Sequence, residues 1–374
     1  MRLLCAFYEG DMKKVLKVLG IILAVIVAAA LALFIFLAVD EYRPEETENL
    51  EISGDGTRTV EKGSSIRLLS WNLGYGALGD DADYFMDGGT KVYTDNKKRV
   101  YENLDYDLSV IEEAGADIVC VQEIDRNSSR SWHIDEFEYF TQNTSLPALS
   151  AQSIFALNYK VAYIPLPVPP MGKIYGGISL FSDYEIEEAQ RISLPCPFDW
   201  PYRILNLKRC LEVTRFPVEG SDKQLVVINL HLEAFDNGEG KAAQTLVLKE
   251  VLDAEVSKGN YVIAVGDFNQ TFGGTDTANF PAVGKEGDFW MPGLIDENEF
   301  GEEFSLYQDE KVASGRSLDR ALTEADSTLP SDFQYYIIDG MIVSDNIEVE
   351  DFFVEDHGFY SSDHNPMIID FKLK

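Results

Sequence analysis

Short apolar runs recur along the chain after residue 65, and each has the length of a β-strand. The runs are rich in Val, Ile and Leu and are bounded by turn-forming residues, which favours strands over short buried helices. They cover residues 66–72, 117–122, 160–164, 176–181, 224–232, 261–266, 335–343 and 366–371. Apolar positions three and four residues apart predict helices over 97–114 and 240–257. Residues 271–334 hold few strand signals and are predicted to form a long loop region.

These elements favour a layered α/β fold. Strands and helices mix at irregular spacing, unlike the regular alternation of a Rossmann domain. The chain shows no internal repeat and no low-complexity tract. We therefore expect buried sheets joined by long functional loops.

The N-terminal part of the chain has a different pattern. Residues 18–39 carry no charge over 22 positions, and a helix of that length reaches about 33 Å, enough to cross a bilayer. Lys13, Lys14 and Lys17 precede this run and acidic residues follow it, which places the N-terminus in the cytoplasm. A cleaved signal peptide is the alternative, although the run exceeds the usual apolar length of such peptides.

The pattern predicts four parts. Residues 1–17 would be cytoplasmic, 18–39 a transmembrane signal anchor, 40–64 an acidic linker with one short strand, and 65–374 an extracellular folded domain. Mature protein that begins near Leu33 would favour a cleaved signal peptide instead of the anchor.

The charge balance limits the partners. Lys and Arg number 31 against 64 Asp and Glu, so the formal net charge is -33, which disfavours binding of nucleic acid. Among the four Cys, Cys196 and Cys210 could pair in an oxidising exterior, whereas Cys120 lies in an apolar run and is expected to be a buried thiol.

Polar residues stand where four predicted strands end. The apolar runs stop at Asn72, at Gln122-Glu123, at His231 and at Asp267, with Asn269 two positions further on. Burying such groups is costly unless they are paired or bound to a metal, so their recurrence predicts one shared cleft. Two of only four histidines belong to this pattern, because His231 ends a strand and His364 follows Asp363.

In chain order these residues form six motifs: WN (71–72), QE (122–123), NLH (229–231), GDFN (266–269), ID (338–339) and SDHNP (362–366). The set resembles the endonuclease/exonuclease/phosphatase superfamily, which includes DNase I, abasic-site endonucleases, inositol polyphosphate 5-phosphatases and bacterial sphingomyelinases. The resemblance covers residues 66–374. It implies a four-layer α/β/β/α sandwich with two packed mixed sheets.

The resemblance also implies a role for each side chain. Glu123 would hold Mg²⁺, or Mn²⁺ or Ca²⁺, with Asn72 and Asp363 near the same ion. Asp267 would orient or deprotonate the attacking water. The groups expected on the phosphate are Asn269, His231 and a protonated His364, the last supported by Asp339. Asp339 could instead be a loop carboxylate, because Gly340 stands where relatives often carry an aromatic residue or His.

The expected function is metal-dependent phosphodiester hydrolysis at the outer face of a membrane, on lipid head groups or small phosphodiesters. Extracellular nuclease, inositol phosphate phosphatase and a noncatalytic binding domain are the alternatives.

Three further segments are ambiguous. The aromatic, Pro-rich segments 163–175 and 195–202 would touch lipid or a hydrophobic substrate if exposed, and would otherwise pack over a sheet edge. Asp80, Asp81, Asp83 and Asp87 are expected to form a solvated turn rather than a Ca²⁺ loop.

Overall fold

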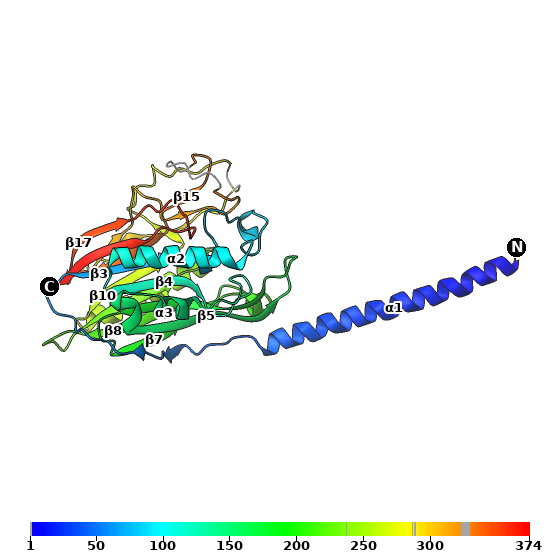
Figure 1. Ribbon diagram of the computed structural model, residues 1–374, viewed down its shortest axis with the longest axis horizontal. Helices are drawn as coiled ribbons and strands as arrows, with labels where there is room; N and C mark the ends of the chain where they lie inside the picture. Colours follow the sequence, from blue (N-terminus) through cyan, green and yellow to red (C-terminus); the bar gives the residue numbers. More distant parts are fainter. Residues whose placement is uncertain (1, 237, 286, 288, 323–329) are drawn as a thin grey trace.

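The structure is a computed structural model that describes residues 2–236, 238–285, 287, 289–322 and 330–374. Over these residues the chain forms two seven-stranded sheets (Figure 1). The first has the order β1 (Thr47–Asn49), β7 (Glu188–Ser193), β8 (Cys210–Pro217), β9 (Gln224–His231), β10 (Tyr261–Asp267), β16 (Asp339–Ser344), β13 (Phe304–Tyr307). The second has the order β17 (Ile347–Val354), β18 (Met367–Leu373), β3 (Ile66–Asn72), β4 (Ile118–Asp125), β6 (Gly172–Ser182), β5 (Gln152–Ile164), β2 (Ser53–Gly54).

Both sheets are mixed, because β9 and β10 are parallel, as are β3 and β4, while their other neighbours are antiparallel. Two small pairs complete the strands: β11 (Gln270–Phe272) with β12 (Gly293–Ile295), and β14 (Gly315–Arg316) with β15 (Tyr335–Tyr336). Short 3₁₀ turns are η1 (Gly74–Gly76), η2 (Phe85–Asp87), η3 (Tyr202–Leu205) and η4 (Glu297–Phe300).

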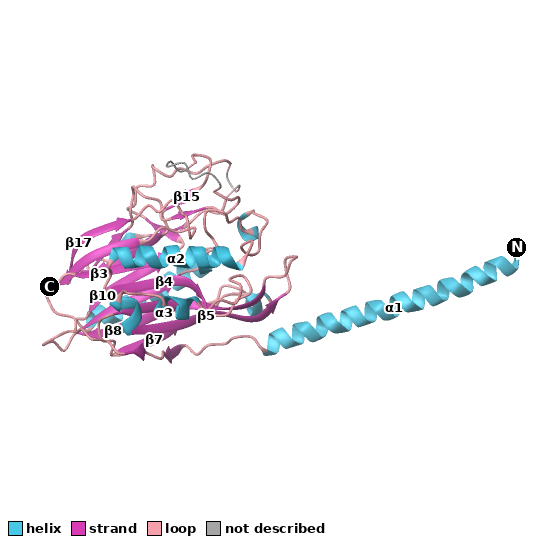
Figure 2. Cartoon of the chain, in the orientation of Figure 1, coloured by secondary structure: helices cyan, strands magenta, loops and turns pink. Residues whose placement is uncertain are grey.

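Helices cover the outer faces of the two sheets (Figure 2). On the second sheet lie α2 (Lys97–Ala114), α3 (Glu136–Gln142) and α4 (Pro147–Ala151), and on the first lies α5 (Glu239–Ser257). The α2 helix begins where the Asn96 side chain accepts a hydrogen bond from Arg99 N, and ends at Gly115, whose φ of 63° favours glycine. The four layers confirm the predicted sandwich.

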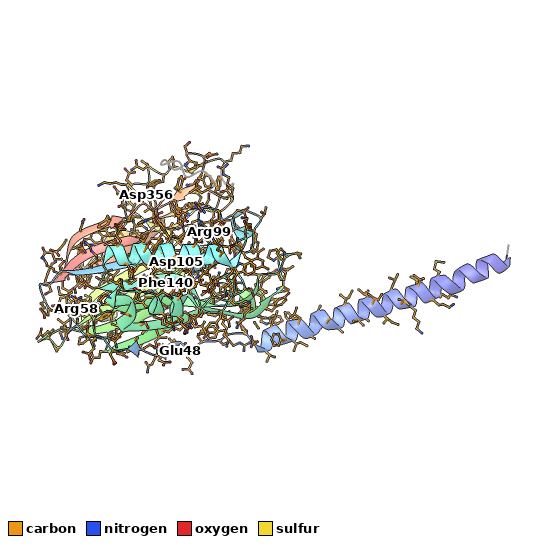
Figure 3. All side chains as sticks on the ribbon, viewed as in Figure 1. Glu48, Arg58, Arg99, Asp105, Phe140 and Asp356 are labelled. Carbon is orange, nitrogen blue, oxygen red and sulfur yellow. The ribbon has the colours of Figure 1, made fainter. Side chains whose placement is uncertain are left out.

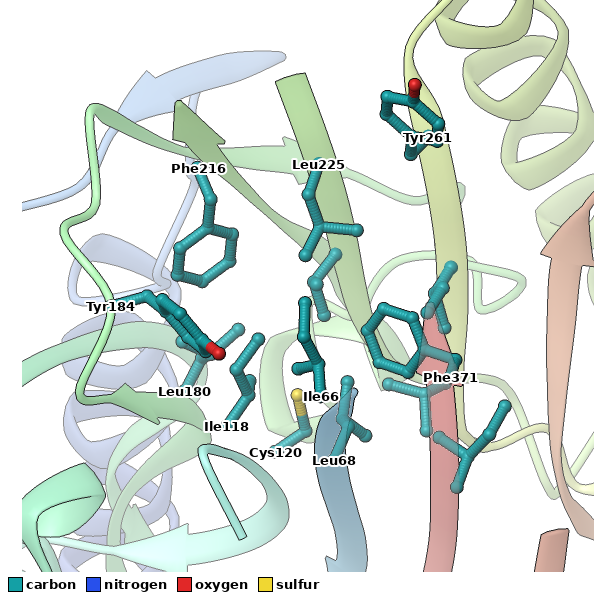
Figure 4. Packing of buried hydrophobic residues seen from close by; sticks show 14 of the residues in the cluster. Ile66, Leu68, Ile118, Cys120, Leu180, Tyr184, Phe216, Leu225, Tyr261 and Phe371 are labelled. Carbon is teal, nitrogen blue, oxygen red and sulfur yellow. The ribbon is translucent and has the colours of Figure 1, made fainter. Parts of the chain in front are cut away.

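The central core lies between the sheets (Figure 4). Alternate residues of each strand face it: Ile66 and Leu68 point inward, whereas Leu69 and Trp71 pack against α2. On the other sheet, Ile263 points inward in the same way, while its neighbours pack under α5. Both faces of these strands are therefore buried, which explains their continuous apolar runs.

Strands β7, β8 and β17 were not predicted, because polar residues interrupt their apolar pattern. In β8, Glu212 is fully buried against Asn229, and Arg215 pairs with Glu255 at 2.7 Å. The run predicted over 335–343 divides into β15 and β16. The described part of 271–334 holds only short strands, as expected, and residues 323–329 lie outside the described residues.

The segment expected to be a linker runs along the domain. Within residues 40–64, β1 extends the first sheet beside β7, and β2 extends the second beside β5. Val60 is completely buried in the central core. Residues 47–60 of this segment therefore tie the two sheets together.

The N-terminal helix α1 (Arg2–Val39) projects from the domain as a rod (Figure 1). Figure 3 shows its side chains standing clear of the domain over most of the length. Its stretch Met12–Val39 is apolar and long enough to cross a membrane, a property that an anchor shares with a signal sequence. Among the described side chains, its last turns contact the domain, through Leu33, Phe34, Leu37 and Ala38.

Candidate active site

The predicted site residues converge at one end of the two sheets. Strand register places Asp267 between His231 on β9 and Asp339 on β16. A cavity of about 440 Å³ opens there. It is lined by seven of the eight predicted residues: Asn72, Glu123, His231, Asp267, Asn269, Asp363 and His364. The eighth, Asp339, lies behind His364.

Five polar side chains, joined by hydrogen bonds and close charge contacts, meet at the site. His364 Nδ1 lies 2.7 Å from Asp339 Oδ2, and its Nε2 lies 3.8 Å from Asp267 Oδ2. Asn72 Nδ2 donates to the same Asp267 oxygen at 3.1 Å. His231 Nε2, on the neighbouring strand β9, lies 3.4 Å from that oxygen. One carboxylate oxygen therefore faces three polar side chains.

The two histidines have opposite electrostatic surroundings. Burial alone would lower the pKa of His364, but the carboxylates of Asp339 and Asp267 outweigh it and hold that pKa well above its ordinary value. Burial holds the pKa of His231 well below its ordinary value, and the positive charge of Arg209 adds to this effect. The site therefore combines a charged imidazolium with a neutral imidazole at neutral pH.

Three carboxylates on the facing side of the cavity, those of Glu123, Asp87 and Asp363, have raised pKa values. Burial raises the pKa of Glu123 to about 7, with Arg130 opposing the shift and Asp363 adding to it. Burial likewise raises the pKa of Asp87 to about 7, and Asp363 and Glu123 add to it. The buried Asp363 Oδ1 has no hydrogen-bond partner. Such a set of hard oxygen atoms fits a divalent cation.

Among the described residues, Asp267, Asp339 and His364 are the group whose potential ligand atoms converge, all within 4.8 Å of one another. The site thus offers a possible metal position on this group as well as the predicted one at Glu123, Asp363 and Asn72. The assignment of ligands between them stays a prediction.

An unusual backbone conformation orients the side chains of Glu123 and Asn269. Glu123 has a φ of 52° at a register shift between β4 and β6, so a bulge turns its carboxylate out of the strand. Asn269 also has a φ of 52°, and its backbone N–H donates to Asp267 Oδ1 at 2.8 Å. Non-glycine residues rarely adopt this conformation, and such residues gather at functional sites.

A buried polar network joins the sheets beneath the site. Gln122 Nε2 donates to Asn229 Oδ1 at 2.7 Å, and Asn229 Nδ2 donates to Glu212 Oε2 at 2.8 Å. Burial raises the pKa of Glu212 to about 8. The first residues of the QE and NLH motifs are therefore structural, and they hold Glu123 and His231 in place.

Several cavity residues were missed by sequence reasoning, three arginines above all. Arg209 donates to the backbone oxygen of His231 at 3.1 Å and to Glu233 at 3.2 Å. Arg130 forms a bidentate pair with Asp125 and covers the Tyr75 ring at 3.7 Å. Arg316 also lines the cavity. These arginines lie outside the six motifs. Arg209 could have been identified only from the pairing of β8 with β9, which brings it beside His231.

Two other predictions have clear outcomes. Cys196 and Cys210 are free thiols, so the possible disulfide is not formed. Asp80 and Asp81 pair with Arg99, while Asp83 accepts hydrogen bonds from the backbone of its own loop. Of the four aspartates in this acidic loop, Asp87 alone lines the cavity.

The two facing mixed sheets and the polar cluster at their strand ends define the class of DNase I-like phosphoester hydrolases. The chain belongs to the endonuclease/exonuclease/phosphatase family, whose model matches residues 69–364. No curated protein sequence matches it.

Solved structures show the same fold. An endonuclease/exonuclease/phosphatase from Beutenbergia cavernae is 16% identical, with a TM-score of 0.52, over 83% of this chain and 72% of that one. Another from Bacteroides vulgatus is 17% identical, with a TM-score of 0.50, over 83% of this chain and 100% of that one. At such identities the likeness concerns the fold alone.

Proposed function

We propose that the protein is a metal-dependent phosphodiesterase, held by α1 at the outer face of the membrane, which acts on lipid head groups or small phosphodiesters. The observation that carries this proposal is the Asp339–His364–Asp267 group, beside a cavity that the carboxylates of Glu123 and Asp363 also line. Phosphoester hydrolysis requires these features together: a base for water, donors for the phosphate oxygens, and a place for a cation.

Each side chain has a proposed role in this reaction. Asp267 accepts a proton from the attacking water, whose oxygen forms the new bond to phosphorus. His364, protonated and oriented by Asp339, donates a hydrogen bond to the phosphate, and Asn269 and His231 donate to its other oxygens. The bond from phosphorus to the leaving alcohol breaks, and that alcohol takes up a proton. A divalent cation such as Mg²⁺, held by Glu123 with Asn72 and Asp363, would neutralise charge on the phosphate.

The charge of the chain favours small or zwitterionic substrates. At a formal net charge of -33, the protein repels long polyanions such as nucleic acid. A substrate that presents a single phosphodiester avoids most of this repulsion.

A substrate panel tests the proposal. The purified full chain is incubated with Mg²⁺, Mn²⁺ or Ca²⁺ and bis-p-nitrophenyl phosphate, phosphatidylcholine vesicles, plasmid DNA or inositol phosphates, with EDTA as the metal-free control. We expect metal-dependent cleavage of the first two, and loss of it in Asp267→Asn. Cleavage of DNA alone would identify a nuclease, and no cleavage of any substrate would favour a binding domain.

A further inference from the structure

The cavity has a polar end and an apolar end. Away from the catalytic group, its lining includes Tyr159, Ile164, Met171, Leu205 and Leu207, here called the apolar wall. A polar phosphoester alone has no use for such a wall, which matches instead a substrate with a hydrocarbon part.

The apolar wall is continuous with the end of α1. The five wall residues belong to one packed cluster that also includes Leu33, Leu37 and Ala38 of the helix. Leu37 is only 7% exposed there. The last turns of α1 therefore belong to the same packed apolar cluster as the cavity wall.

Helix geometry gives the level of this contact in a bilayer. The last basic residue before the apolar run is Lys17, so the hydrocarbon core begins at Val18. A core of about 30 Å takes about 20 helical residues, which puts its outer boundary at Leu37. The apolar wall thus lies at the level of the outer head groups when α1 spans the membrane.

Exposed apolar side chains surround the same end of the cavity. Leu166 and Val168, in the turn between β5 and β6, are 67% and 88% exposed, and Trp200 and Tyr202 are 54% and 75% exposed. We call these four residues the rim. Figure 1 shows the turn between β5 and β6 on the side of the domain from which α1 projects. Aromatic and aliphatic side chains exposed in this way are typical of a membrane interface.

A contact between Trp200 and α1 indicates how far the rim reaches into the bilayer. The ring of Trp200 lies 5.5 Å from that of Phe34, in a T-shaped arrangement. Phe34 is three residues before Leu37, which is about 4.5 Å deeper along the helix. Trp200 therefore reaches the boundary between head groups and acyl chains, where tryptophan is favoured.

We propose that the substrate is a phospholipid of the leaflet that the rim enters, whose acyl chain leaves the site along the apolar wall. The inference rests on the proposed function and on α1 remaining attached. Because the domain is strongly acidic, a zwitterionic head group fits better than an anionic one. Water adds to the lipid phosphorus, one P–O ester bond breaks, and the products are a phosphomonoester and an alcohol that has gained a proton.

The rim can be tested without releasing the protein from the membrane. The full chain is reconstituted in phosphatidylcholine vesicles as wild type, as Val168→Asp/Trp200→Asp, and as Leu246→Asp, which places one such charge on an exposed leucine of α5. Neither Val168 nor Trp200 lines the cavity. Hydrolysis of vesicle lipid is compared with that of soluble bis-p-nitrophenyl phosphate.

We expect the rim variant to lose about tenfold or more in lipid hydrolysis while it keeps soluble hydrolysis within about twofold. Leu246→Asp should keep both activities. Equal lipid hydrolysis by the rim variant and the control would overturn the proposal. If the wild type cleaved neither substrate, the proposed function itself would fail.

A binding measurement separates these failures. Brominated phosphatidylcholine quenches tryptophans that lie at acyl-chain depth, so it should quench the full chain strongly and the Trp200→Phe variant much less. Equal quenching of the two would contradict the placement of the rim, whatever the catalytic result.

Discussion

Replacing Asp339 by Asn removes a negative charge from beside His364 and leaves a hydrogen-bond acceptor in the same place. Asp339 Oδ2 lies 2.7 Å from His364 Nδ1, and both side chains are buried. A hydrogen bond to a charged group contributes about 1.5–3 kcal/mol, and one pKa unit corresponds to about 1.4 kcal/mol. The substitution should therefore lower the pKa of His364 by about 1–2 units.

The catalytic cost follows from the same free energy. If the imidazolium of His364 stabilises the transition state, kcat/KM for bis-p-nitrophenyl phosphate should fall by about 10- to 100-fold in Asp339→Asn. The raised pKa keeps His364 protonated to higher pH in the wild type, so the loss of activity on the alkaline side should begin at lower pH in the variant.

The assay is an NMR titration of the full chain labelled at histidine. The sequence has four histidines, so His364 can be assigned from one substitution. Asp345→Asn serves as a matched control, because Asp345 is exposed and follows the end of β16. An unchanged titration of His364 in Asp339→Asn would refute the reasoning, even if activity fell.

Three further outcomes follow from the structure. Burial raises the folded-state pKa of Glu212 to about 8. The stability that protonated Glu212 contributes is therefore fully present below about pH 4.5 and is lost as pH rises through 8. Relative to Glu212→Gln, the free energy of unfolding of the wild type should fall by about 1.4 kcal/mol per pH unit between pH 6 and 8, measured as a falling Tm. A Tm without this relative pH dependence would argue against a buried Glu212. Mg²⁺ at a hundred times its Kd should stabilise the wild type by about 2.7 kcal/mol in thermal unfolding and should stabilise Glu123→Gln less. An equal stabilisation of both proteins would show that Glu123 is not a metal ligand. Leu68→Ala, in the fully buried core between the sheets, should cost about 2–5 kcal/mol by denaturant unfolding, and a cost below about 1 kcal/mol would contradict the packing described.

Much of the fold could be predicted because its central strands are buried on both faces. Strand β10 is apolar at nearly every position and β3 at most positions, and their polar ends mark the site. The predicted helix over 97–114 coincides with α2, because its apolar face and its capping residues are all local signals. The grouping of Asn72, Asp267 and His364 followed from strand ends that meet at one edge.

The remaining features depend on contacts between distant residues. Strand β8 is hidden by Glu212 and Arg215, whose partners Asn229 and Glu255 come later in the chain. Arg209 enters the site only through the pairing of β8 with β9. The apolar wall combines residues in and beside β5 and η3, and it packs in one cluster with α1, which no local pattern connects to it.

Turnover of bis-p-nitrophenyl phosphate by the full chain with Mg²⁺ tests the central claim most directly, when His364→Ala is compared with His133→Ala. His133 is exposed and lies outside the cavity, so its replacement controls for the loss of a histidine. We predict that His133→Ala keeps wild-type turnover and that His364→Ala loses at least about 100-fold while both variants unfold at similar temperatures. Near-normal turnover by a folded His364→Ala would contradict the assignment of this cavity as the hydrolytic site.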